Sequence, residues 1–539
     1  MKDARSKLLS AATCAAALLS GTGLTSTTAQ AQADAALKQE AMANVDAHAT
    51  MVQQAVDQIF SYAEPGFQEV KSTKYIAGLL EKNGFKIEWG IAGIPTAFKA
   101  TWGEGGPLIA LGSDIDCLLG VSQYPGTGKL IPMVAGAPGH GEGHNSGMPL
   151  IVAAAIAAKD VMTKHGIKGR LMIWPGIAEE LLATKAYYVR DGLFKGVDAN
   201  IFTHVSSDFG TAWGELGNNG LVSVEYTFHG RTAHAAGDPW DGLSALDAVE
   251  LMDTAWNFRR EHLPVTQRSH YVITNGGGQP NVVPDLATVW YYFRERTFKS
   301  VADLYKIGND IADGAAKQTG TTVEHRILGY AAPNYGNKPM AEAAYENIKL
   351  VGMPKWTADD QTFAKTVQTT LGREVKPLPA TVGELSTPAN RQRSIGGGSD
   401  DVGDIMWTVP SITIRFPSNI PSMIAHNKIA AIAMATPIAH KGAVAGAKAV
   451  ALTVLDLMTT PDLIAKAKDF QQNVQFKEDS YAPLITASDK PAIWLNHDLM
   501  EKMRPQMAKF YYDSAKYPSY LAQLGIAYPG DADKDVTAN

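Results

Sequence analysis

Two histidines and a glutamate stand within five positions, between glycines, in the stretch PGHGEGHNSG at residues 138–147. His140, Glu142 and His144 are residue types that bind divalent metal ions, because imidazole nitrogens and carboxylate oxygens suit zinc and related metals. Glycine-flanked histidines also occur in ordinary polar turns, so this stretch alone is a weak signal. A metal site requires further ligands that the fold brings to the same place.

Further carboxylates and imidazoles follow segments that read as buried strands. These polar residues are Asp114 and Asp116, Glu179 and Glu180, His204, and, after a short loop, His426. Each alone has a plain explanation, such as a loop cap, a complement to a helix dipole or a hydrogen-bonded structural histidine. Ligands of open α/β sheets bind beyond the carboxyl ends of the strands, so the combination predicts a metal site at one sheet edge. Two divalent ions roughly 3.5 to 4 Å apart would need such a mixture, with a further carboxylate to transfer protons.

The elements that must position these residues alternate between strand and helix. Amphipathic or Ala-rich helices are predicted at 36–61, 70–83 and 147–166, and strands at 107–113, 170–176, 199–205 and 409–417. Strands that alternate with helices favour a mostly parallel sheet covered on both faces. From about residue 219 the order becomes strand, helix, strand, strand, helix, strand, which predicts an inserted, smaller α+β domain.

The length of 539 residues indicates at least two domains. The predicted divisions are a signal peptide at 1–31, a catalytic domain at 32–218 and 334–470, the inserted domain at 219–333 and a C-terminal extension at 471–539. A basic start, a short apolar run and small residues before Gln32 are typical of a secretory signal peptide, which predicts an exported, periplasmic or secreted protein. After its removal Cys117 is the single cysteine, so no internal disulfide forms. The formal net charge of −6 argues against nucleic-acid and anionic-membrane partners.

Ordered blocks between about residues 110 and 450 resemble the dinuclear zinc aminoacylase and carboxypeptidase family. Within it they are most similar to the amidohydrolase branch that includes aminobenzoyl-glutamate hydrolase and the indole-acetyl-amino-acid hydrolases. The blocks are SDIDCLLGVSQ, GHGEGHNSG, AEE, FTH, FHGRTAHAAGDPWDGLSALDAVELM, GGGQPNVVPD, GGGSDDVGDI and TPIAHKGAVAGAKAVA. The resemblance implies an α/β catalytic domain whose mixed, mostly parallel sheet is flanked by helices, with an inserted α+β lid and dimerisation domain.

The resemblance also implies a role for each residue of the site. The implied metal ligands are Glu142, His144, Glu180, His204 and His426. Glu179 would be the general base and acid, Asp116 would orient a ligand, and His140 would be structural or support a ligand. The branch commonly has cysteine where Glu142 stands, and carboxylate is a harder donor than thiolate, which leaves open how Glu142 coordinates. Two divalent ions are expected, with Zn²⁺ the first choice and Mn²⁺ or Co²⁺ also compatible.

Three further positions come from the resemblance to the family. His234, in GRTAHAAGDP, would reach an active site, often that of the partner in a homodimer, and help to stabilise the oxyanion. Asn281 would bind substrate, and Arg294 or Arg296 would hold a substrate carboxylate. His440 competes with His426 as the last ligand, and we prefer His426 because it closely follows a strand whereas His440 opens a helix.

The predicted function is metal-dependent hydrolysis of an amide bond in N-acyl or N-aroyl amino acids, or in small peptide-like compounds. Metal-activated water would attack the carbonyl, with Glu179 as the base. One alternative is a non-catalytic binding protein on the same fold, which would be expected to have lost Glu179. Another is an aminopeptidase or a different dinuclear metallohydrolase such as a phosphodiesterase, although a phosphate site would want more arginine or lysine near the metals.

Overall fold

The computed structural model describes residues 22–391 and 397–530. Residues 1–21 of the predicted signal peptide and residues 531–539 of the predicted C-terminal extension lie outside this range. Helix α1 (Thr22–Ala47) crosses the predicted cleavage position after Ala31. The single helix predicted at 36–61 is two helices, because His48 leaves the helical conformation (φ −96°, ψ 6°) before α2 (Ala49–Tyr62) begins.

Within the described residues, a seven-stranded sheet forms the centre of the predicted catalytic domain. Its order is β1 (Lys86–Trp89), β2 (Phe98–Glu104), β4 (Gly169–Gly176), β3 (Leu108–Asp114), β5 (Ala199–Ser206), β13 (Ser411–Pro417) and β6 (Gly210–Thr211). The four strands from β4 to β13 are parallel, and the strands at both edges are antiparallel. The mixed, mostly parallel sheet is therefore confirmed. Because neighbouring parallel strands end at one edge, the loops after β3, β4, β5 and β13 lie side by side.

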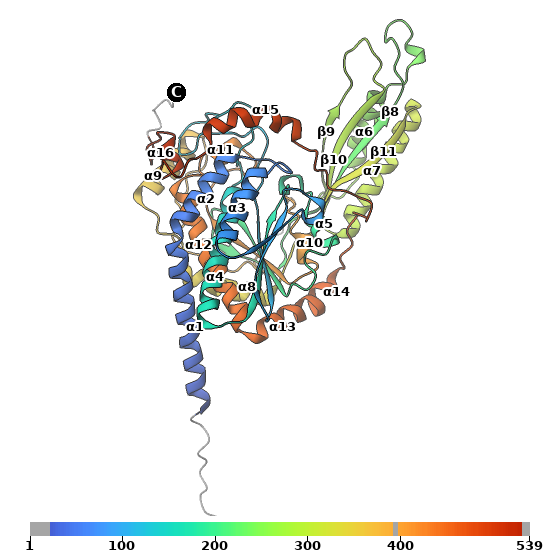
Figure 1. Ribbon diagram of the computed structural model, residues 1–539. Helices are drawn as coiled ribbons and strands as arrows, with labels where there is room; N and C mark the ends of the chain where they lie inside the picture. The colour runs from blue at the N-terminus through green and yellow to red at the C-terminus, as the bar shows by residue number, and fades with distance from the viewer. Residues whose placement is uncertain (1–21, 392–396, 531–539) are drawn as a thin grey trace, which may run out of the picture.

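Helices surround this sheet (Figure 1). They are α1, α2, α3 (Val70–Lys82), α4 (Gly147–His165), α5 (Lys185–Arg190), α8 (Lys338–Val351), α9 (Ala358–Thr370), α10 (Gly403–Met406), α11 (Lys428–Ala431), α12 (Pro437–Thr459) and α13 (Pro461–Phe470). Helices α4 and α12 pack against each other and against β3 and β13. Both are long and apolar enough to cross a membrane by length and composition, but most of each is buried inside the protein.

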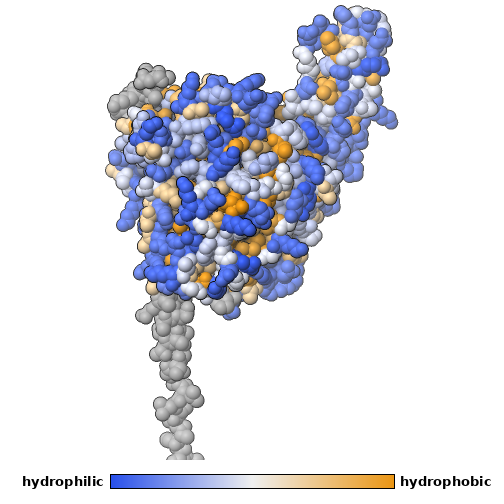
Figure 2. Space-filling view, viewed as in Figure 1, coloured by the Kyte–Doolittle hydropathy of each residue, from blue (hydrophilic) through white to orange (hydrophobic). Residues whose placement is uncertain are grey.

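The inserted domain projects from this body (Figure 1). Its antiparallel sheet has the order β11 (Thr322–Ala331), β8 (Gly220–His229), β10 (Leu286–Glu295) and β9 (Arg268–Asn275), and helices α6 (Ala245–Arg260) and α7 (Phe298–Thr319) pack on one another and on the sheet. Burial alternates along β10, as expected for a strand with one face covered. The surface of this domain is mainly hydrophilic in Figure 2, with separate hydrophobic side chains.

The C-terminal segment packs along the catalytic domain rather than forming a separate unit. It contains α14 (Phe476–Glu478), α15 (His497–Met507) and α16 (Tyr520–Gln523). Met500 and Met507 are buried with Cys117 and Ala137, which belong to the loop that leads to the GHGEGH stretch. The extension therefore packs against the loop that leads to Glu142 and His144.

Candidate metal centre

The candidate site is built on loops whose backbones are held in unusual conformations. After β4, Ala178 (φ 51°) and Leu182 (φ 52°) bracket the single 3₁₀ turn Glu179–Leu181, and after β13 the backbone of His426 has φ 56°. Left-handed conformations cost free energy for residues other than glycine and persist where the surroundings fix them. The turn at 179–181 is fixed by Glu69, a buried residue whose carboxylate accepts the N–H of Ala178 at 2.9 Å.

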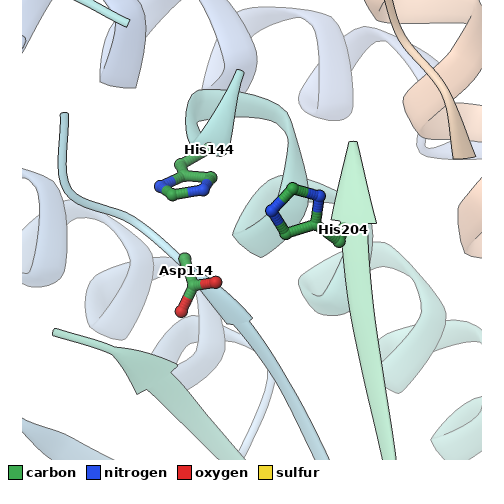
Figure 3. A group of neighbouring side chains, drawn as sticks. All are labelled: Asp114, His144 and His204. Carbon is green, nitrogen blue, oxygen red and sulfur yellow. The ribbon is translucent and has the colours of Figure 1, made fainter. Parts of the chain in front are cut away.

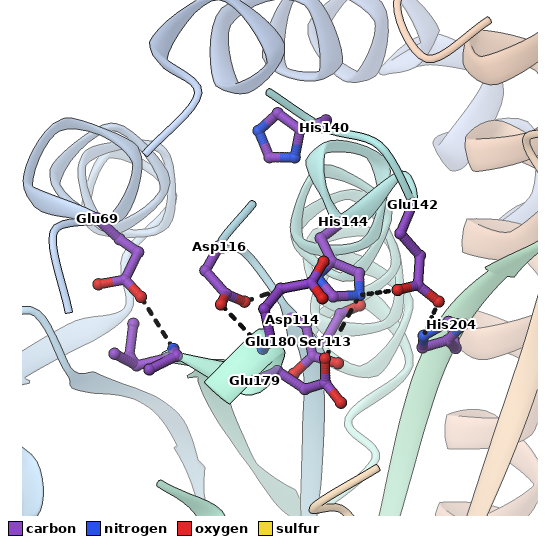
Figure 4. Close-up of polar contacts among 12 residues, drawn as sticks. Glu69, Ser113, Asp114, Asp116, His140, Glu142, His144, Glu179, Glu180 and His204 are labelled. Atoms are coloured by element: carbon purple, nitrogen blue, oxygen red, sulfur yellow. Dashed lines mark hydrogen bonds and ion pairs between the residues drawn. The ribbon is translucent and has the colours of Figure 1, made fainter. Parts of the chain in front are cut away.

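All five predicted ligands lie in one cluster, and Figure 4 labels four of them, Glu142, His144, Glu180 and His204. The two oxygens of Glu142 face different histidines: Oε2 is 2.8 Å from Nε2 of His426, and Oε1 is 3.4 Å from Nε2 of His204. Nε2 of His426 is also 3.3 Å from Oε2 of Glu180. Nε2 of His144 is 4.0 Å from Oε2 of Glu142. Residues separated by up to 284 positions in the chain thus share one small volume.

Two groups of residues, with no member in common, each offer ligand atoms that lie within 4.8 Å of one another. The first group is Asp114, His144 and His204, from the ends of three different segments (Figure 3). The second group is Glu142, Glu180 and His426. Nδ1 of His204 lies 3.0 Å from the carbonyl of Val205, and a proton donated there leaves Nε2 with a free lone pair.

Unsatisfied buried atoms show that this donor set fits cations. Neither ring nitrogen of His144 has a hydrogen-bond partner within the described residues, and the same holds for Oδ1 of Asp116 and Oε2 of Glu180. Nδ1 of His144 is 3.6 Å from Asp116 Oδ1 and 3.8 Å from Glu180 Oε1, too far for hydrogen bonds. Buried polar atoms without partners are costly, and divalent metal ions would satisfy them.

Burial and neighbouring charges raise the pKa of some groups of the site and lower the pKa of others. Burial raises the pKa of Glu180 to about 8, although His144 opposes this. Burial also lowers the pKa of His204 to about 4. Although burial opposes it, the hydrogen bond from His426 holds the pKa of Glu142 well below its usual range, with the charges of His204 and His144 adding to the effect. Divalent cations would favour the ionised form of these carboxyl groups.

Glu179 lies beside a buried charge cluster that sequence reasoning missed. Ligand atoms of Glu179, Asp114 and Asp400 lie within 4.8 Å of one another. The ammonium of the fully buried Lys185 is 2.6 Å from Oδ1 of Asp114, and it also donates to Asp401. Burial, followed by the charge of Asp114, raises the pKa of Glu179 well above its usual range. The motif SDD hinted at the two aspartates, but no local pattern marked Lys185.

Asp116 and His140, the two residues predicted to support the ligands, differ in their distance from the cluster. Oδ2 of Asp116 accepts the N–H of Glu180 at 3.0 Å, so Asp116 positions the backbone of one predicted ligand. His140 lies away from the cluster: its Nε2 is 3.2 Å from the carbonyl of Ile59, and burial lowers its pKa to about 3, so the ring is neutral. His440 is bound by Asp57 at 2.7 Å and does not join the cluster.

The three predicted residues of the inserted domain are divided between its two ends. The register pairs His229 with Leu286 at one end of β8 and β10, and Leu221 with Arg294 at the other. Arg294 lies at the end near the catalytic domain, where Nη1 is 3.5 Å from Ser399 Oγ and where the charge of Glu179 acts on it.

His234 and Asn281 lie in the loops at the far end of the inserted domain. They are neighbours, because the N–H of Ala235 donates to the carbonyl of Asn281 at 3.1 Å. The structure therefore brings Arg294 close to its own chain's cluster but not His234 or Asn281.

Comparison with known proteins finds relatives that match most of the length of this chain. Residues 216–320 match the family model described as the M20 peptidase dimerisation domain. The chain is 33% identical over 452 residues to a subunit of the p-aminobenzoyl-glutamate hydrolase of Escherichia coli, covering 79% of this chain and 93% of that protein. It is 27% identical over 450 residues to the Xaa-Arg dipeptidase of Mus musculus, covering 81% and 93%. The fold is similar to a crystal structure of an aminobenzoyl-glutamate utilization protein from Klebsiella pneumoniae, with a TM-score of 0.52 and 16% identity over 76% of this chain and 96% of that one.

Proposed function

Since this chain belongs to the M20 family of metallopeptidases and amidohydrolases, we propose that it hydrolyses the amide bond of an N-acyl or N-aroyl amino acid, or of a small peptide-like compound, with two divalent metal ions. The carrying observation is the convergence of Glu142, His144, Glu180, His204 and His426 around buried atoms that lack hydrogen-bond partners. The resemblance inferred from the sequence is confirmed at the level of the family.

The donor set supports zinc as the resident metal. Three imidazoles and two carboxylates form the mixture of nitrogen and oxygen ligands that zinc binds in catalytic sites. Glu142 has one oxygen near His204 and the other near His426, so both of its oxygens would be available to hold metal ions. When bound, the ions would polarise the substrate carbonyl and lower the pKa of a water molecule.

Glu179 is the group that moves the proton. Its Oε2 is 3.9 Å from Nε2 of His144, so the carboxylate borders the ligand cluster. Its raised pKa suits a group that accepts a proton from the attacking water and then gives it to the departing amine nitrogen. We propose that Arg294, on the inserted domain, holds a substrate carboxylate; the charge of Glu179 acts on its guanidinium, which supports a place near the centre.

The variant Glu179→Gln tests this role. Loss of a general base costs roughly 10²–10⁴-fold in turnover, so kcat for release of free amine from a panel of acyl and aroyl amino acids should fall by that amount. Metal content, measured by elemental analysis, should stay at the wild-type value, and Glu324→Gln, on the exposed face of β11, serves as the control. Turnover above a few per cent in Glu179→Gln would contradict the assignment. Bound metal without turnover in the wild-type protein would favour the binding-protein alternative.

We also propose that the protein is a homodimer that associates through the inserted domain. Strand β9 is an edge of its sheet and carries exposed Val272 and Ile273, and Phe258 on α6 is 71% exposed. Unpaired edge strands with apolar side chains favour pairing with another chain. His234 is exposed at the far end of this domain, and its Nδ1 accepts two backbone N–H groups, which leaves Nε2–H as a donor for a partner's site.

Subunit mixing tests this arrangement. His234→Ala and Glu179→Gln should each be inactive alone, whereas a mixed dimer would contain one complete site. After subunit exchange in equal amounts, activity should return to about one quarter of the wild-type value, as two-fold symmetry predicts. No recovery despite exchange, shown by mass-tagged chains, would mean that His234 does not serve the partner.

Export from the cytoplasm is a separate proposal, supported by the basic and apolar composition of the first 31 residues. Cleavage after Ala31 should give a mature chain that begins at Gln32. N-terminal sequencing of the protein recovered from the producing organism would check this, and an intact start at Met1 would contradict it.

A further inference from the structure

A cleft of about 430 Å³ opens beside the cluster of predicted metal ligands, on the side of β13. Its lining includes Arg415 and Thr413 of β13, Gly210 and Thr211 of β6, Ser206 at the end of β5, and Asp400. Two of these residues connect it to the candidate centre: Asp400 offers a ligand atom within 4.8 Å of those of Glu179 and Asp114, and Nη1 of Arg415 is 3.3 Å from Nδ1 of His204. A volume of this size is typical of a site for a small molecule.

The sheet register places Arg415 directly next to His204, a member of the cluster of predicted metal ligands. In the parallel pair of β5 and β13, Arg415 is the partner of His204, so both side chains point to the same face of the sheet. On its other side, Arg415 is paired with Gly210 of β6. Gly210 has no side chain, and a Cβ atom built there would meet no atom within 4 Å. Across the three strands, the side chains of His204 and Arg415 therefore lie next to each other, and the space beside Gly210 is open.

Arg415 lacks an anionic partner. Its side chain is exposed, and among residues 22–391 and 397–530 no carboxylate lies within ion-pair distance of it. Nδ1 of His204 does not serve as its acceptor, since that nitrogen donates its proton to the carbonyl of Val205 at 3.0 Å. The guanidinium of the other arginine of the cleft, Arg391, is occupied by backbone carbonyls, among them that of Trp213 at 3.0 Å.

We propose that Arg415 binds a carboxylate of the amide substrate in this cleft, so that the enzyme selects amides with an anionic group on the part that lies over β13 and β6. The inference rests on the proposed hydrolase function. A planar guanidinium offers two parallel N–H groups to a carboxylate, and such bonds are stronger than neutral ones. The other acidic residues of the cleft fit this interpretation: Asp208 and Glu384 are exposed to solvent, and Asp400 is engaged by the N–H of Val402 at 2.9 Å.

Arg415 is distinct from Arg294, which approaches the centre from the inserted domain. The two guanidiniums thus come from different domains, Arg415 from strand β13 and Arg294 from strand β10. The carboxylate at Arg415 can belong to the amino-acid half or to the acyl half of the amide, and matched substrates separate these cases.

The first test compares kcat/KM for paired substrates in the metal-loaded enzyme. N-benzoylglycine and N-benzoylglycinamide differ in a carboxylate on the amine half, and N-(4-carboxybenzoyl)glycinamide and N-benzoylglycinamide differ in one on the acyl half. In Arg415→Met, the ratio of acid to neutral amide should fall by roughly 10- to 100-fold for one pair, as expected for loss of a charge-assisted hydrogen bond. Arg415→Lys should keep part of this preference. An equal loss for acid and neutral substrates would overturn the proposal, because Arg415 would then act on the reaction and not on the carboxylate.

The second test is independent of turnover. Calorimetric binding of glutarate to the metal-loaded protein should weaken at least about tenfold in Arg415→Met, while binding of glutaramide should not change. Arg326→Met, at an exposed arginine of β11 that pairs with Glu225, is the matched control. If the wild-type protein hydrolyses none of these amides but the glutarate difference is present, the proposed function fails and the carboxylate site stands. Equal glutarate binding by wild-type and Arg415→Met refutes the site whatever the enzyme hydrolyses.

Gly210→Val provides a variant that leaves every charge in place. Space at Gly210 lets the backbone accept a side chain, and the added bulk narrows the cleft opposite Arg415. The variant should raise KM for the preferred acidic substrate several-fold with little change in kcat. Unchanged KM in both Gly210→Val and Arg415→Met would show that the substrate does not enter this cleft.

Discussion

Replacing Lys185 by methionine should destabilise the fold by about 3 to 5 kcal/mol, the usual cost of breaking a buried ion pair by removing one partner. The ammonium is fully buried, 2.6 Å from Oδ1 of Asp114, and donates to Asp401 as well. The side chains of both aspartates are buried too, so water cannot replace the lost cation. Methionine has a similar length and fills the space, which confines the loss to the charge.

Urea unfolding at pH 8, with a chelator present so that metal binding does not contribute, would measure this loss. Lys168→Met is the control, because Lys168 pairs with Glu104 on the surface and such pairs contribute at most about 1 kcal/mol. The loss in Lys185→Met should shrink at acidic pH, since protonated Asp114 and Asp401 no longer need a cation. A loss below about 1 kcal/mol at pH 8 would refute the reasoning, because the buried carboxylates would then not depend on the ammonium.

Three further predictions concern pH, metal binding and packing. Burial raises the pKa of Asp404 from 3.8 to about 8, so the folded state keeps a proton that the unfolded chain releases near pH 4; stability should therefore fall as pH rises from 4 to 8. In Asp404→Asn, the difference between urea midpoints at pH 5 and pH 9 should shrink, and an unchanged difference would exclude this group as its source. His426→Ala should lower the metal bound per chain in elemental analysis whereas His440→Ala should not, and the reverse result would exchange their roles. Gly112→Ala places a Cβ atom 2.2 Å from the ring of Trp174, so it should cost about 1 to 3 kcal/mol and lower the Tm, and an unchanged Tm would show that the indole moves aside freely.

Local patterns predicted most of the elements, because burial on a sheet or helix repeats with a fixed period. The strand predicted at 199–205 is β5 (Ala199–Ser206), and the helix predicted at 147–166 is α4 (Gly147–His165). The antiparallel strands β1 and β2 were not predicted: β1 is a four-residue edge strand that is mostly exposed, and β2, next to it, is only partly buried, so both carry little periodic signal. The break at His48 was missed because the apolar spacing continues across it.

The candidate site was predicted in part. Polar residues after strands predicted a site at this edge, because parallel strands end at a common edge. The roles of the five members of the cluster and of Glu179 came from the resemblance to the family. Lys185 and Arg415 were missed: one is an ordinary residue at the start of a helix, and the other lies within an apolar strand. Their neighbours, Asp401 and His204, are 216 and 211 positions away along the chain, so no local pattern records the contacts.

The sequence by itself determined which chemical groups lie at the ends of which strands, and therefore that imidazoles and carboxylates meet at one edge of the sheet. Only the tertiary structure decided how they are arranged: Glu142 between His204 and His426, His440 held by Asp57, and His234 far along the inserted domain from Arg294. The physical reason is that secondary structure follows from neighbours in the chain. The distance between two side chains on different strands follows from register and packing, which the whole fold sets together.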